Sequence, residues 1–169
     1  DIETAKQLAS SGHETWLIDV FDSYFLPVSL SSMDKLPADD LSEFIFKASQ
    51  MTGKQVIVVT SGRSAIPLLR ATRQLQINHA EEPGLTGLIL ISPKFYLQTP
   101  APGTEPSLMP IVEHSNVLLF VIQPEKSPWY WKLDQTIPAL EKSGSDVYLQ
   151  RIAGVRDRFY FRPDASQYE

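Results

Sequence analysis

Residues 55–75 read QVIVVTSGRSAIPLLRATRQL, and this stretch decides the fold. Its first six residues are nearly all apolar or β-branched, which is typical of a strand covered on both faces. A tight Ser-Gly-Arg-Ser turn follows, and from Ala65 onward apolar residues recur at helical spacing. Pro67 falls in the first helical turn, where its missing N–H costs little. The stretch therefore predicts a strand over 55–60 that passes directly into a helix over 65–76.

Short apolar runs and amphipathic stretches alternate along the rest of the chain in the same way. Besides the unit above, the pattern predicts helices over 2–11, 39–51 and 128–142 and strands over 14–20, 87–92, 116–122 and 147–152. Strands that alternate with helices favour a parallel sheet with right-handed crossovers. We therefore predict an α/β fold of three layers, α/β/α, around a mostly parallel five-stranded sheet.

The length of 169 residues favours one domain over 1–169. Residues 93–115 hold five prolines and show no strong periodicity. A structureless stretch of that length is uncommon inside a compact domain. We expect 93–115 to be a long proline-rich excursion from the sheet and 160–169 to be a short tail.

The composition excludes several classes of function. Fifteen Lys and Arg against twenty Asp and Glu give a net charge of −5, which argues against binding nucleic acid or an anionic membrane surface. The chain has no cysteine, so disulfides, thiolate zinc sites and cysteine nucleophiles are absent. No apolar run approaches the ~20 residues that span a bilayer, and the three histidines show no metal-ligand spacing. We expect no metal and no cofactor, and either a cytoplasmic protein or an exported one with its signal removed.

The turn after the strand over 55–60 is the strongest candidate for a chemical site. A strand, a sharp turn containing Gly-x-Ser and an immediate helix make the layout of a nucleophile elbow. Ser64 is then the candidate nucleophile, and the helix N-terminus behind it provides N–H groups for an oxyanion. As an alternative, Ser61, Gly62 and Arg63 form a candidate anion-binding turn at the same helix N-terminus.

With that turn in place, the chain resembles the α/β-hydrolase superfamily over most of its length. The opening AKQLASSGHETWLIDV is similar to the helix and strand before the elbow, and VIVVTSGRSAIPLLRATRQL to the elbow strand and its helix. The later stretches LTGLILISPKF, NVLLFVIQPEKSPW and DVYLQRIAGVRDRF are similar to the next strand, the acid-bearing strand and the strand before the catalytic histidine.

The resemblance implies a position for the catalytic acid and a gap at one side of the sheet. Glu125 falls where the family has its acid, and Asp157 is a second candidate acid. The family's earlier strands, and the loop that supplies half of its oxyanion hole, would lie before Asp1. The resemblance therefore implies a version truncated at the N-terminus, with an open sheet edge that a protein partner or a neighbouring domain covers.

The sequence departs from the family where the base is required. Ile66 is bulky where the elbow has a small residue, and no histidine follows the last predicted strand. His13, His79 and His114 precede strands, whereas Ser64 follows one. A five- or six-residue strand separates its two ends by about 17–20 Å, and a general base has to come within ~3 Å of the proton it removes.

This degenerate triad leaves three hypotheses. The first is an α/β-hydrolase-like domain that has lost catalysis and serves as a binding or scaffold domain. The second is an esterase-type serine hydrolase that uses Ser64 with Glu125 or Asp157 as the acid and a base from outside the chain. The third is an anion- or phosphate-binding domain that uses the 61–64 turn.

Overall fold

The computed structural model describes residues 2–98, 101, 104–105 and 107–159 of the chain. Its strands are β1 (Val56–Ser61), β2 (Leu85–Ile91), β3 (Leu119–Lys126) and β4 (Val147–Arg156). They form one sheet in the order β1-β2-β3-β4, and every pairing is parallel. The predicted α/β class with a parallel sheet is confirmed, but the sheet has four strands where five were predicted.

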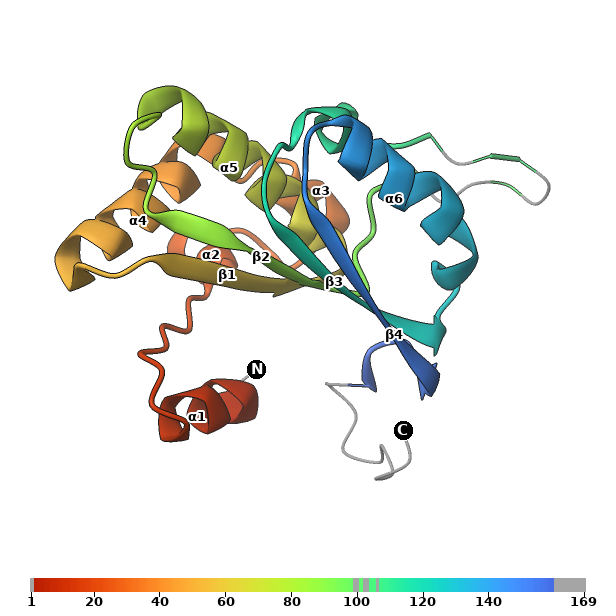
Figure 1. Cartoon of the computed structure of the whole chain (residues 1–169), viewed down its shortest axis with the longest axis horizontal. Coiled ribbons are helices and arrows are strands. Elements are labelled where there is room, and N and C mark those ends of the chain that lie inside the picture. The colour runs from red at the N-terminus through yellow and green to blue at the C-terminus, as the bar shows by residue number, and fades with distance from the viewer. Residues whose placement is uncertain (1, 99–100, 102–103, 106, 160–169) are drawn as a thin grey trace.

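Most helices lie on one side of this sheet. The helices are α1 (Ile2–Ser10), α2 (Val20–Ser23), α3 (Leu30–Met33), α4 (Ala38–Thr52), α5 (Ala65–Asn78) and α6 (Leu133–Lys142), with 3-10 turns η1 (Gly62–Ser64), η2 (Pro110–His114) and η3 (Tyr130–Lys132). Figure 1 shows α4, α5 and α6 above the sheet and α1 below it. No residue of α1 is buried, so the layer on the lower side is thin. None of these helices is long and apolar enough to cross a membrane, as far as the described residues go.

The predicted strand over 14–20 is wrong. A strand needs a neighbour for its backbone ladder, and β1 pairs only with β2 among the described strands. Residues 13–19 are neither helix nor strand. They end at Asp19, whose Oδ1 accepts a hydrogen bond from the N–H of Asp22 at 3.0 Å and so caps α2. Without a ladder or a covering layer, Trp16, Leu17 and Ile18 remain 44–57% exposed.

The hydrophobic core lies between the sheet and the helices above it. α5 contributes one apolar face, and Leu140 of α6 packs beside it. The predicted excursion over 93–115 contributes Phe95, Met109 and Val112 to this core. The predicted tail over 160–169 lies outside the described residues. Among the described residues, the buried residues of this core are Ala65, Ile66, Leu69, Leu88, Leu90, Phe95, Met109, Val112, Leu119, Val121 and Leu140.

The opposite face of the sheet is apolar and open. One row of paired positions crosses all four strands, and its side chains are Val59, Ile89, Phe120 and Tyr148. Val59, Phe120 and Tyr148 are 40–56% exposed. We call this surface the open face; its members are Ile57, Val59, Ile89, Ile91, Phe120, Ile122, Tyr148 and Ile152. Parallel sheets are nearly always covered on both faces, so this surface is unusual.

Candidate functional site

The turn between β1 and α5 differs from the predicted elbow in its backbone. In a nucleophile elbow the serine occupies the sharp, strained position between strand and helix. Here the residue with positive φ, at +59°, is Gly62. Ser64 has ordinary helical torsions (φ −63°, ψ −11°) and stands at the N-cap of α5, with no side-chain capping hydrogen bond. The apex of the turn therefore carries no side chain.

The side chain of Arg63 is held by the chain itself. Its Nη1 donates to the carbonyl oxygen of Tyr96 at 2.6 Å, and its Nη2 donates to that of Leu97 at 3.4 Å and lies 3.8 Å from a carboxylate oxygen of Asp34. The guanidinium thus ties η1 to the start of the excursion. Ser61, at the end of β1, is extended and makes no capping hydrogen bond. An anion at this turn has to compete with the three acceptors that Arg63 already meets.

The two candidate acids lie at the carboxyl ends of two different strands, and their hydrogen-bond partners are residues other than Ser64. Glu125, near the end of β3, accepts a hydrogen bond from the N–H of Gly154 at 2.7 Å. Asp157, just after β4, accepts one from the hydroxyl of Ser92 and lies 3.8 Å from the amino group of Lys94. Within the described part of the chain, no hydrogen bond joins either carboxylate to Ser64. The structure does not assemble the three predicted catalytic residues into a relay.

Instead, the carboxyl ends of the strands meet in a polar group that the sequence did not single out as a site. Ser92 follows β2, Ser127 follows β3 and Asp157 follows β4; the Ser92 hydroxyl lies 3.4 Å from that of Ser127. Lys94 completes the group, and its amino group sits 5.3 Å from the ring centre of Trp129. We call Ser92, Lys94, Ser127 and Asp157 the carboxyl-edge cluster. Each member follows a strand end, which is the one signal in the sequence that could have found it.

The carboxyl-edge cluster satisfies its own polar groups. Ser92 is only 1% exposed and Ser127 only 2%, so both residues are almost wholly covered. Ser92 also has a positive φ of +46°, which is uncommon outside glycine. The hydrogen bond from the Ser92 hydroxyl to Asp157, together with the ion pair between Asp157 and Lys94, offsets that strain. The cluster therefore ties three loops together rather than presenting a reactive group.

The histidines lie at the other end of the molecule. His79 is the C-cap of α5, whereas Ser64 is its N-cap. The 14 residues of α5 separate these two ends by about 21 Å, because a helix rises about 1.5 Å per residue. His114 ends η2 just before β3, and His13 neighbours Glu14, which pairs with Lys54 ahead of β1.

The imidazole of His79 contacts two side chains of α4. Its ring stacks on Phe46 with centroids 3.7 Å apart, and its Nε2 lies 3.2 Å from a carboxylate oxygen of Glu43. The hydrogen bond from His79, with a further contribution from Lys47, holds the pKa of Glu43 below its ordinary value. The arrangement stabilises the packing of α4 against α5 and leaves this imidazole unavailable to the carboxyl ends of the strands.

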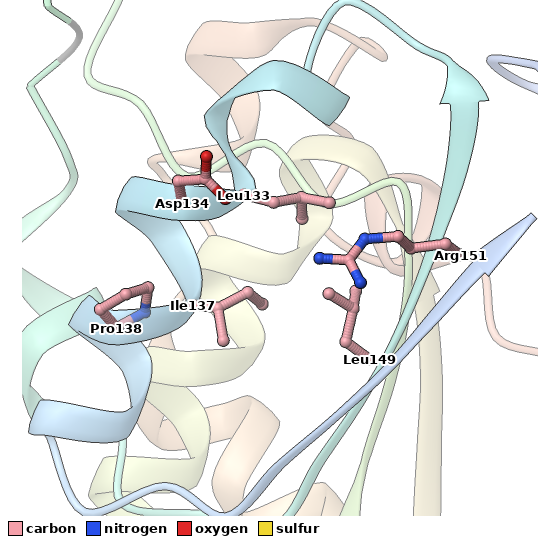
Figure 2. Close-up of a pocket in the computed structure, with 6 residues that line it drawn as sticks. All are labelled: Leu133, Asp134, Ile137, Pro138, Leu149 and Arg151. Carbon is pink, nitrogen blue, oxygen red and sulfur yellow. The ribbon is translucent and has the colours of Figure 1, made fainter.

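Two open hollows on the described part of the chain are lined by residues other than Ser64. One, of about 590 Å³, lies at the end of β3 and is lined by Glu125, Lys126, Ser127, Pro128 and Trp131. The other, of about 270 Å³, lies between α6 and β4 (Figure 2). No group of three histidine or carboxylate side chains suited to a metal ion occurs among the residues that the structure describes.

Comparison with known proteins gives a structural likeness only. No family model matches the chain, and no curated protein matches it. Two solved structures are similar to it: Thermogutta terrifontis esterase 2 phosphoramylated by tabun, at 15% identity, and the same esterase phosphorylated by paraoxon, at 16%. Each covers 78% of this chain with a TM-score of 0.49. The chain spans only 58% and 57% of those esterase chains, which is less than two thirds of their length. The α/β class stated above follows from the chain's own sheet topology.

Proposed function

We propose that this chain is an α/β-hydrolase-like domain that has lost catalysis and serves as a binding or scaffold domain. The observation that carries the proposal is the identity of the residue at the apex of the turn after β1. That residue is Gly62, with φ +59°, and glycine offers no nucleophile. The next hydroxyl along the chain, that of Ser64, belongs to a residue in ordinary helical conformation, without the strain that exposes a nucleophile.

The position of the imidazoles supports the same conclusion. A serine hydroxyl becomes a nucleophile when an adjacent base accepts its proton. His79 lies at the far end of α5 and is bonded to Glu43. Lys94 is also engaged, because its amino group lies 3.8 Å from a carboxylate oxygen of Asp157. An esterase that used Ser64 would therefore need a base from outside this chain.

The open face supports a role in binding. The eight members of the open face carry aliphatic or aromatic side chains, and none of them is charged. Large exposed apolar patches mark sites of interaction with proteins or other apolar surfaces. Because helices normally cover both faces of a parallel sheet, a helix of a partner protein or neighbouring domain is the occupant that fits this face best.

The loss of catalysis is tested by ester hydrolysis. We expect the chain to hydrolyse p-nitrophenyl acetate no faster than a Ser64→Ala variant, because Ser64 has no base within reach. The release of p-nitrophenol, followed by absorbance, measures both rates under the same conditions. A rate above background that Ser64→Ala removes would contradict the proposal and favour the esterase hypothesis.

The binding role of the open face is tested with an apolar dye. The fluorescence of anilinonaphthalene sulfonate rises when the dye binds exposed apolar surface. We expect the folded chain to enhance that fluorescence and the variant Phe120→Ser/Tyr148→Ser to lose most of the enhancement. Trp131→Ser is the matched control, because Trp131 is 78% exposed but lies outside the open face. Equal fluorescence of the wild type and the double variant would show that the open face is not the accessible apolar surface.

A further inference from the structure

β4 is an outer strand with a long unpaired edge. It has ten residues, more than any other strand, and β3 is its only neighbour in the sheet order. Within the described residues, no strand pairs with its other edge. An edge of this length is a template for another strand. β4 has no proline and no lysine, and the irregularity in its pairing with β3 comes after Ile152, beyond the centre of the strand.

A groove runs beside that edge on the helix side of the sheet. Figure 2 shows Leu133 and Ile137 of α6 facing Leu149 and Arg151 of β4 across it. Its floor is apolar, and its volume is about 270 Å³. A strand added to β4 would cover the floor of this groove while its backbone pairs with the edge.

Two side chains of opposite charge stand at the rim of the groove. Asp134 stands on the α6 side and Arg151 on the β4 side. Among the residues that the structure describes, neither side chain forms a hydrogen bond or an ion pair, with each other or with any third group. Two opposite charges on one surface make that surface complementary to a second copy of itself, which is the condition for a two-fold symmetric interface.

We propose that two copies of this chain associate through antiparallel pairing of their β4 strands, which joins the two four-stranded sheets edge to edge. The pairing is centred on Gln150, so that Gln150 faces Gln150 of the second copy. Leu149 then faces Arg151 of the second copy on the helix side, and Tyr148 faces Ile152 on the open face. This register brings each Arg151 toward Asp134 of the other copy. A pairing centred on Arg151 would instead place like charges directly opposite each other, which is destabilising.

The association also extends the open face. Tyr148 and Ile152 belong to that face, so pairing through β4 makes the open faces of both copies continuous. The resulting surface is twice as wide as that of one chain. This inference stands on the β4 edge and its groove, and it does not depend on whether the chain is catalytic.

A charge exchange across the interface tests the proposal. In analytical ultracentrifugation, we expect the wild-type chain to have a molar mass twice the 19.0 kDa of one chain. Either Arg151→Asp or Asp134→Arg should raise the dissociation constant by about 10-fold or more, because each sets like charges against each other. The double variant Asp134→Arg/Arg151→Asp should restore the dimer. Arg73→Asp, on the exposed side of α5, is the matched control and should leave the dimer intact.

A cross-linking experiment tests the register. The chain has no cysteine, so Gln150→Cys introduces a single thiol that faces itself in the proposed dimer at a distance that suits a disulfide. We expect oxidation to give a covalent dimer with Gln150→Cys and little with Tyr148→Cys, whose opposite residue is Ile152.

Three outcomes would overturn the proposal. The first is a wild-type chain whose sedimentation gives a molar mass of 19.0 kDa at every concentration. The β4 edge would then not pair with a second copy of this chain. The second is a double charge variant no more dimeric than the single ones. The third is cross-linking that is as strong with Tyr148→Cys as with Gln150→Cys.

Discussion

Leu119→Ala is expected to lower the free energy of unfolding by about 2–5 kcal/mol, whereas Phe120→Ala, the next residue of β3, should lower it by only about 1 kcal/mol. Leu119 is fully buried under α5 and α6, and shortening it leaves a cavity that the surrounding core cannot fill. Phe120 is 40% exposed on the open face, so its removal leaves no enclosed cavity. Urea unfolding of both variants, followed by circular dichroism, gives the two free energies.

The two positions are neighbours on one strand, and their side chains point to opposite faces of the sheet. Phenylalanine is the larger side chain and would be the costlier loss if both faces were covered. A Phe120→Ala variant as destabilised as Leu119→Ala would mean that the open face is covered within this chain. The binding role that we assign to that face would then lose its basis.

Gly84→Ala is expected to destabilise the chain by about 2–5 kcal/mol, the sum of a backbone cost and a packing cost. Gly84 has φ +71°, in the left-handed region, and a Cβ there would lie 2.5 Å from the Cβ of Ser49 on α4. Its carbonyl oxygen also accepts the hydrogen bond from the N–H of Val56 that starts β1. The added methyl group therefore pushes α4 away from the point at which β1 and β2 begin.

Gly53→Ala is the control for this second prediction. Gly53 has a similar φ of +64°, but no atom lies within 4 Å of the Cβ that alanine would add. Its substitution should cost only the backbone term of about 1–2 kcal/mol. Thermal unfolding of both variants measures the difference. Equal losses at the two positions would show that the contact with Ser49 does not constrain the packing of α4.

The elements that the sequence predicts correctly are those with a strong local pattern. The continuous apolar run before Ser61 and the helical spacing after Ala65 suffice to predict β1 and α5. The strand predicted over 14–20 is wrong because a strand depends on a partner, and the pattern of residues within a segment carries no information about whether one is present. Here Asp19 caps a short helix instead.

The candidate site could be predicted only in part, and for a related reason. The sequence predicts a sharp turn between the strand over 55–60 and the helix over 65–76, and η1 does join β1 to α5, but the Gly-x-Ser spacing does not reveal which residue takes the positive φ. Glycine adopts that conformation at the lowest cost, and Gly62 does so here. The carboxyl-edge cluster joins residues as far apart as Ser92 and Asp157, a contact that arises only once three strands are aligned.

The open face is the feature that the sequence hides most completely. Nearly continuous apolar runs in β1, β2 and β3 predict cover on both faces of the sheet. In the structure one of those faces carries exposed side chains, including Val59 and Tyr148. The apolar composition of a strand is the same whether its face is covered by the chain's own helices or left exposed. It therefore does not distinguish the two cases.

The most direct test of the account is the reaction of the intact chain with a fluorophosphonate, read out by mass spectrometry. Such a probe bonds covalently to a serine only when a neighbouring base activates its hydroxyl. With a known serine hydrolase labelled in the same tube as a positive control, we predict that this chain keeps its unmodified mass. A stoichiometric adduct located at Ser64 would contradict the central claim that this turn has no activated nucleophile.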